Sequence, residues 1–174
     1  MNTHVLENEN LRVAVADRGA ELISVFDKEA KTERIWNADA SVWNRHAPIL
    51  FPFVGKVVNG KYRYNGKEYS MKTQHGFARD LEFTCTEEST TTVKHCLVSS
   101  EETKEIYPFD FKLTVEHCLS SERPNTLSIN WMIVNTGIGK MYYSIGGHPG
   151  FMPPKGVKKE ECFIGFPGRD ELYY

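Results

Sequence analysis

The 174-residue sequence has no long apolar run, and its formal net charge is only −2. A membrane-spanning helix needs about 20 consecutive apolar residues, and nucleic-acid binding usually needs a basic surface. We therefore expect neither a membrane partner nor a nucleic-acid partner. The first residues also lack the basic and apolar regions of a signal peptide. These absences predict a soluble, cytoplasmic protein.

Cysteine is scarce, and no two cysteines form a C-x-x-C pair. Without a secretion signal, free thiols are the expectation rather than two disulfides. The sequence also has no phosphate-binding loop, dinucleotide fingerprint or G-x-S-x-G elbow. Phosphoryl transfer and hydride transfer therefore lose support. The four cysteines are Cys85, Cys96, Cys118 and Cys162.

What the sequence does have is apolar residues at every second position, which is typical of strands. Asn65-Gly66 lies between two alternating runs and predicts a type I′ hairpin, since both central residues need positive φ. Residues 101–106 could form one helical turn. The fold class is therefore all-β, with one domain over residues 1–174 and long antiparallel strands in a sandwich or wide barrel. The predicted strands are 11–16, 22–26, 61–64, 67–70, 81–86, 91–98, 109–119, 126–134, 141–145 and 162–166.

Two glycine-flanked histidines carry most of the chemical information. His75 opens the motif His-Gly-Phe-Ala-Arg at residues 75–79. Imidazole exchanges a proton near neutral pH, and the guanidinium of Arg79 suits hydroxyl clusters, carboxylate or phosphate. Phe77, in the same motif, offers an aromatic face for a sugar. The alternatives are a capping role for His75 and a surface ion pair between Arg79 and Asp80.

The second histidine, His148, follows two glycines and precedes Pro149-Gly150-Phe151. Glycines suit a strand poorly unless something approaches the backbone there, and proline ends the ladder. His148 and His75 therefore predict one active-site cleft, with Phe151 as a further aromatic face. The alternative is a buried histidine in a tight turn. No metal is expected between His75 and His148, because no paired ligand motif accompanies them.

Residues 43–56 form an apolar stretch that contains two prolines, which rules out a central strand. We expect an ordered, extended segment packed on the core. Arg45, at its head, and Lys56, at its tail, could both reach the site. His46 lies within this stretch, and the other three histidines, His4, His95 and His117, lie in alternating patterns and are expected to be surface or structural residues.

These motifs together resemble the aldose 1-epimerase (galactose mutarotase) superfamily, most closely its LacX-like and hexose-6-phosphate-mutarotase-like branch. Their order and spacing match along almost the whole chain, and the motif at residues 75–79 is the most specific. The resemblance implies an antiparallel β-sandwich of the galactose mutarotase (supersandwich) type. The matching residues are 47–52, 55–56, 59–62, 75–79 and 147–151.

The resemblance also implies a chemistry, the interconversion of the α and β anomers of a hexose or hexose phosphate. The histidine matching His148 protonates the ring oxygen, and the one matching His75 binds and polarises the sugar. A carboxylate takes the proton from the C1 hydroxyl. This acid–base cycle needs no cofactor. Lys56 stands where many relatives place an arginine, so it keeps the charge and loses the bidentate fork.

The resemblance also implies that relatives are roughly twice as long and carry a catalytic glutamate past the second histidine. Glu160, Glu161 and Glu171 do not occupy that position. We therefore expect a sandwich that is incomplete at its C-terminus, with weak or no epimerase activity and self-association through exposed sheet edges. A non-catalytic carbohydrate-binding module and a purely structural sandwich remain as alternatives.

Overall fold

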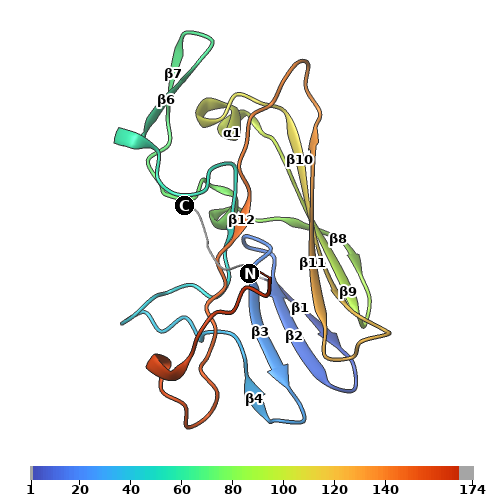
Figure 1. Ribbon diagram of the computed structural model, residues 1–174. Helices are drawn as coiled ribbons and strands as arrows, with labels where there is room; N and C mark the ends of the chain where they lie inside the picture. Colours follow the sequence, from blue (N-terminus) through green and yellow to red (C-terminus); the bar gives the residue numbers. More distant parts are fainter. Residues whose placement is uncertain (1, 169–174) are drawn as a thin grey trace.

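The computed structural model describes residues 2–168, in which two four-stranded antiparallel sheets dominate (Figure 1). The all-β, antiparallel fold class is thus confirmed. In the first sheet the order is β1 (Thr3–Glu7), β2 (Leu11–Ala16), β3 (Leu22–Asp27) and β4 (Thr32–Glu33). In the second the order is β11 (Leu127–Asn135), β10 (Phe111–Leu119), β9 (Thr92–Val98) and β8 (Thr84–Glu88).

Alternation explains why the second sheet buries one face. In β10, Phe111, Leu113 and Val115 are buried, whereas Lys112 between them is exposed. Successive side chains of a strand point to opposite faces, so a period-two pattern gives one apolar face. The register runs without a break from Phe111 opposite Asn135 to Leu119 opposite Leu127.

The Asn-Gly hairpin was predicted correctly. Strands β6 (Lys61–Tyr64) and β7 (Lys67–Ser70) pair antiparallel and project away from the rest of the chain (Figure 1). Asn65 and Gly66 have φ of 46° and 79°, as a type I′ turn requires. The hairpin lies apart from both large sheets.

Two predicted strands were wrong, and four strands were missed. Residues 141–145 and 162–166 form no strand, and in the first of them Ser144 donates its N–H to the Pro52 carbonyl outside any ladder. The missed strands are β1 and three of two residues each, which are β4, Ile49–Leu50 and Gly146–Gly147. The predicted helical turn is confirmed as α1 (Glu101–Ile106), because Ser100 and Thr103 form a capping box at its start. The 3-10 turns are Val58–Gly60, Ala78–Asp80 and Lys159–Glu161.

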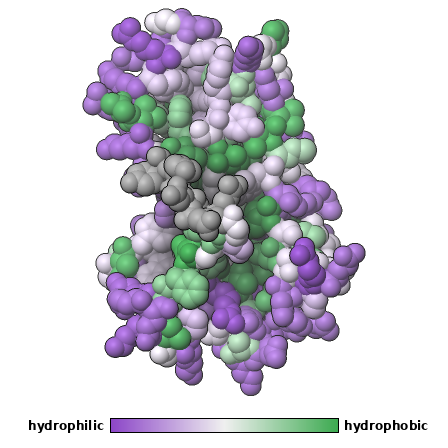
Figure 2. All heavy atoms as spheres, viewed as in Figure 1, coloured by the Kyte–Doolittle hydropathy of each residue, from purple (hydrophilic) through white to green (hydrophobic). Residues whose placement is uncertain are grey.

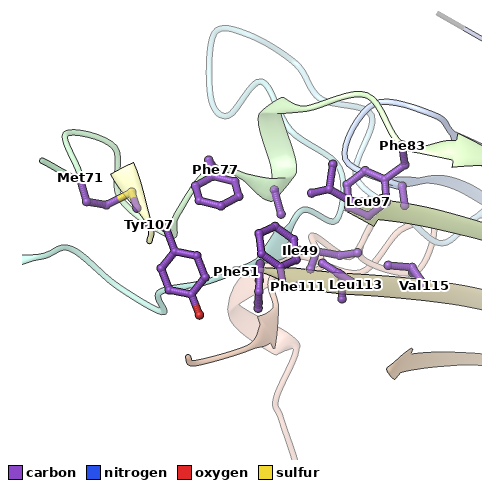
Figure 3. Close-up of a cluster of buried hydrophobic side chains, with 12 residues drawn as sticks. Ile49, Phe51, Met71, Phe77, Phe83, Leu97, Tyr107, Phe111, Leu113 and Val115 are labelled. Carbon is purple, nitrogen blue, oxygen red and sulfur yellow. The ribbon is translucent and has the colours of Figure 1, made fainter. Parts of the chain in front are cut away.

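The core consists of two apolar clusters. One contains side chains from both sheets, including Leu6 and Val13 from the first and Val93 from the second. The other surrounds Phe51, which is fully buried and whose ring lies 5.1 Å from that of Phe111 (Figure 3). This second cluster packs the segment 43–56 against the sheet, as expected, but the segment is bent at residues 44, 46–47, 52 and 54–55 rather than extended throughout. Its members are Ala20, Ile49, Phe51, Met71, Phe77, Ala78, Phe83, Leu97, Tyr107, Phe111, Leu113 and Val115.

Strand β11 is the outer strand of its sheet and exposes large apolar side chains, Trp131 and Met132 among them. Figure 2 shows apolar residues at the surface in the middle of the molecule. Long apolar edges favour pairing with another chain. We therefore still predict self-association.

All four cysteines are free thiols, as predicted. None of the helices between residues 2 and 168 is long and apolar enough to cross a membrane.

Candidate functional site

One segment, residues 48–55, supports both glycine-flanked histidines. Within it, β5 (Ile49–Leu50) pairs antiparallel with β12 (Gly146–Gly147). The ladder continues where His148 donates its N–H to the Pro48 carbonyl at 3.1 Å. The backbone of His148 is therefore fixed to this segment, while its side chain is exposed.

His75 is attached to the other end of the same segment. Its N–H donates to the Gly55 carbonyl at 2.7 Å, and the Gly55 N–H donates to His75 Nδ1 at 3.0 Å. The next residue, Gly76, has a φ of 72° and packs directly on the Phe51 carbonyl. This close approach explains the glycine in the motif, since no side chain would fit there.

The structure brings the two histidines together, as predicted. Their ring centroids are 5.7 Å apart, and the planes are tilted by 52°. His75 is half-buried and His148 is exposed. Two imidazoles at this separation can contact neighbouring oxygen atoms of one small ligand, which suits general acid–base chemistry.

The hydrogen bond from Gly55 determines which nitrogen of His75 carries the proton. A backbone N–H can only donate, so Nδ1 accepts and the neutral ring carries its proton on Nε2. Burial, and then the positive charges of Arg79 and His148, lower the pKa of His75 below its usual value. His75 is therefore a neutral hydrogen-bond donor at physiological pH.

Arg79 and Arg45 have different surroundings. Arg45 donates Nη1 to the Arg79 carbonyl at 3.1 Å and pairs through Nη2 with Asp80, so it braces the turn after Gly76. Arg79 reaches Asp80 only at 3.8 Å, and its buried Nε has no partner among residues 2–168. The Arg79 guanidinium is thus less tightly paired than that of Arg45, although its Nε is buried from solvent.

Tryptophans near His148 escaped the sequence analysis. The Trp43 ring lies 5.1 Å from the imidazole of His148. A Cβ on Gly147 would come within 3.2 Å of the Trp131 ring, which shows how closely that ring packs on the strand. Aromatic faces suit the apolar side of a sugar. The only available signal was that Trp43 begins the apolar stretch in which Arg45 lies.

The other predicted site residues lie in three different environments. Lys56 is exposed and follows Gly55, the residue that holds His75. Phe77 is buried in the core against Phe51 and Phe111, so packing is the role that the structure shows for it. Phe151 is 70% exposed and lines a separate apolar cavity of about 430 Å³. Sugar contacts by these residues stay predictions.

The family model of aldose 1-epimerase matches residues 2–164. The chain belongs to this family. The Lactococcus lactis subsp. lactis protein LacX, in its plasmid form, is 34% identical over 168 residues, and the chromosomal form is 33% identical. The alignments cover 92% of this chain and 55% of each LacX protein. The resemblance drawn from the motifs is thus confirmed.

Two solved structures support the same fold. A galactose mutarotase related enzyme from Lactobacillus acidophilus matches with a TM-score of 0.86 and 38% identity. A galactose mutarotase-like protein from Lactobacillus casei ATCC 334 matches with a TM-score of 0.84 and 36% identity. Each match covers 91% of this chain and 52% of the other. The chain therefore spans about half the length of these aldose 1-epimerase relatives.

The electrostatics of this family site give a first prediction. Replacing Arg79 by Met should raise the pKa of His75 towards its usual value, because one of the charges that repel the imidazolium is removed. Burial, the larger cause, is expected to remain. An NMR titration of the imidazole resonances measures this change.

Lys72→Met is the matched control. Lys72 is an exposed cation three residues before His75 and is not among the causes of its low pKa. The pKa of His75 should stay the same in that variant. A pKa that is unchanged or lower in Arg79→Met would contradict the proposed electrostatic coupling.

Proposed function

We propose that the chain binds an aldose, either a hexose or a hexose phosphate, between His75 and His148, and that both side chains serve the interconversion of its α and β anomers. The observation that carries the proposal is the 5.7 Å approach of the two imidazoles in a chain of the aldose 1-epimerase family. The two residues are far apart in sequence, so their short separation depends on the tertiary fold.

Each histidine has a role that follows from its surroundings. His148, whose side chain is exposed and whose backbone is bonded to Pro48, donates a proton to the ring oxygen as the bond between that oxygen and C1 breaks. His75, neutral and fixed by Gly55, donates Nε2–H to a sugar oxygen. The C1 hydroxyl loses its proton, and the open aldehyde rotates about C1–C2 before the ring closes on its other face.

The reaction also needs a group that accepts the proton of the C1 hydroxyl. Within residues 2–168 neither His75 nor His148 forms a hydrogen bond or ion pair with a carboxylate; Glu160 and Glu161 are exposed in a 3-10 turn, and Glu171 lies outside the described residues. Water must then accept this proton, so we propose that the α and β anomers interconvert slowly. This same observation favours a second function, a carbohydrate-binding module without catalysis.

Phosphorylated sugars are part of the proposal because two cations flank His75. The positive charge of Arg79 is near enough to lower the pKa of His75, and Lys56 is exposed next to Gly55, which holds His75. A guanidinium and an ammonium suit a phosphate group. The free sugars should then bind more weakly than the 6-phosphates.

The function is tested by two NMR measurements on the 174-residue chain, with glucose, galactose and their 6-phosphates. Saturation transfer should show binding of at least one sugar, and exchange spectroscopy should show anomer interconversion only slightly above the buffer rate. His148→Asn should remove the excess interconversion and retain binding, since the general acid is lost while His75 remains.

The outcomes separate the candidate functions. Binding together with exchange that depends on His148 supports an epimerase. Binding without exchange, in both the parent chain and His148→Asn, supports the binding module. No binding of any of the four sugars would contradict both functions.

A further inference from the structure

A second cluster of chemically reactive side chains lies outside the sugar site. It consists of His4 on β1, Cys85 on β8 and His95 on β9, and each of these offers one ligand atom within 4.8 Å of the others. The three residues come from both sheets, since β1 packs against β9. The cluster therefore lies at the junction of the two sheets.

The strand register explains why these side chains meet. Cys85 and His95 are direct neighbours across β8 and β9, next to a bulge that interrupts the pairing after Cys85. Side chains opposite each other in an antiparallel pair are about 5 Å apart at Cβ. Both side chains face the interior, because His95 is fully buried and Cys85 packs on the core cluster of the sheet junction.

The hydrogen bonds around His95 leave one buried nitrogen with a free lone pair. His95 Nε2 lies 3.1 Å from Asp17 Oδ1, and an ionised carboxylate only accepts, so Nε2 carries the proton. Nδ1 is then unprotonated, and it is buried without any partner among residues 2–168. Burial also lowers the pKa of this ring and keeps it neutral. A buried lone pair without a donor is suited to a Lewis acid.

Carboxylates surround the other histidine of the cluster. His4 Nε2 lies 2.8 Å from Asp17 Oδ1, and His4 Nδ1 lies 3.0 Å from Glu88 Oε2. Ligating histidines usually donate their second ring N–H to a carboxylate, which orients the ring. Both ring nitrogens of His4 have a carboxylate partner, so an ion bound at either nitrogen displaces one carboxylate and leaves the other to orient the ring.

We propose that His4, Cys85 and His95 bind a divalent zinc ion at the junction of the two sheets, with Asp17 adjacent as a fourth or outer ligand. Two imidazoles and a thiolate are the donors that zinc prefers, at about 2.0 and 2.3 Å. Ligand atoms around such an ion lie roughly 3.3 to 3.6 Å apart, so the side chains must close by about 1 Å. Binding releases the thiol proton of Cys85.

This site is independent of sugar binding and would have a structural consequence. A zinc ion held by β1, β8 and β9 cross-links the two sheets, and it stabilises the folded state because the unfolded chain does not hold the ligands together. Its failure would leave the proposed epimerase function untouched.

The test titrates metal-free chain with zinc in mildly alkaline buffer, in competition with a coloured chelator. We expect one bound zinc ion per chain and a higher melting temperature. Cobalt should give the near-ultraviolet charge-transfer band of a cobalt–thiolate bond. Cys85→Ser should lose this band and bind zinc at least about tenfold more weakly.

Two controls keep the outcome clear. Cys96→Ser changes a thiol on β9 outside the cluster and should bind zinc like the parent chain. If Cys85→Ser fails to fold, alkylation of the parent chain decides: zinc should protect Cys85 and leave the exposed Cys162 reactive. No stoichiometric binding, equal binding by Cys85→Ser, or equal alkylation of Cys85 with and without zinc would overturn the proposal.

Discussion

Replacing Gly76 by Ala should either unfold the chain or lower its free energy of unfolding by about 3 kcal/mol or more. A Cβ at this position would lie 2.2 Å from the Phe51 carbonyl oxygen and 2.4 Å from its carbon. These are backbone atoms of a buried residue, so they cannot move aside as a flexible side chain would. The φ of 72° adds strain for any residue with a Cβ.

The consequences extend to the site. The same Phe51 carbonyl accepts the N–H groups of Phe77 and Ala78, so moving it away would disturb the turn that carries His75. A folded Gly76→Ala chain should therefore also lose sugar binding. Urea denaturation followed by circular dichroism measures the stability, and saturation transfer measures the binding.

Gly66→Ala is the matched control. Gly66 also has a positive φ, 79°, but a Cβ there would meet nothing within 4 Å. Only the backbone strain remains, which costs about 1–2 kcal/mol, and sugar binding should be unchanged. If both variants lost the same free energy of unfolding, the contact with Phe51 would contribute nothing to stability.

The second large effect is a loss of stability in acid that depends on His117. His117 is 1% exposed in β10, and burial lowers its pKa from 6.5 to about 3. At pH values between these two, the His117 imidazole is protonated in the unfolded chain and neutral in the folded chain. The free energy of unfolding therefore falls as the pH drops below about 6.5, by up to about 1.4 kcal/mol per pH unit.

His117→Leu should remove this share of the pH dependence and make the chain more stable than the parent at pH 5. The ring has a buried Nδ1 without a partner, so an apolar side chain costs little in its place. His95 is buried with a lowered pKa as well and keeps its own share. Urea denaturation at a series of pH values between 7 and 5 gives the slope.

Thr114→Val provides the comparison for His117. Thr114 lies on the same strand, and its buried hydroxyl also has no partner among residues 2–168, but it does not titrate in this range. Its replacement should change stability by the same amount at every pH. A His117→Leu chain with the parent's slope would contradict the buried, neutral state of His117.

Local patterns predicted those parts of the fold that local physics determines. Asn65-Gly66 specifies a hairpin because few other residues accept positive φ twice. The two prolines of the segment 43–56 excluded a central strand, and the segment packs on the core as expected, although it is bent rather than extended outside β5. The glycine in the motif at residues 75–79 pointed to a close approach of backbone, which Phe51 provides.

Other features of the fold and of the proposed zinc site depend on tertiary contacts. Residues 141–145 have strand composition but no ladder partner between residues 2 and 168, and Tyr142 instead accepts the Tyr107 hydroxyl. The cluster of His4, Cys85 and His95 has no short sequence motif, because it depends on two sheets meeting and on one cross-strand register. Such long-range coincidences leave no local periodicity to detect.

The attachment of both histidines to one segment has a consequence for how such chains can diverge. The backbone of His148 is bonded to Pro48 and that of His75 to Gly55, so the stretch 48–55 sets the distance between the two histidines. The stretch is bent between its ends, with bends at residues 52, 54 and 55 and a φ of 86° at Gly55, and the two imidazoles lie only 5.7 Å apart. One inserted or deleted residue would part them, whereas a substitution can leave the spacing intact. The length of this stretch should thus be inherited more strictly than its composition, while the hairpin 61–70 is free to lengthen.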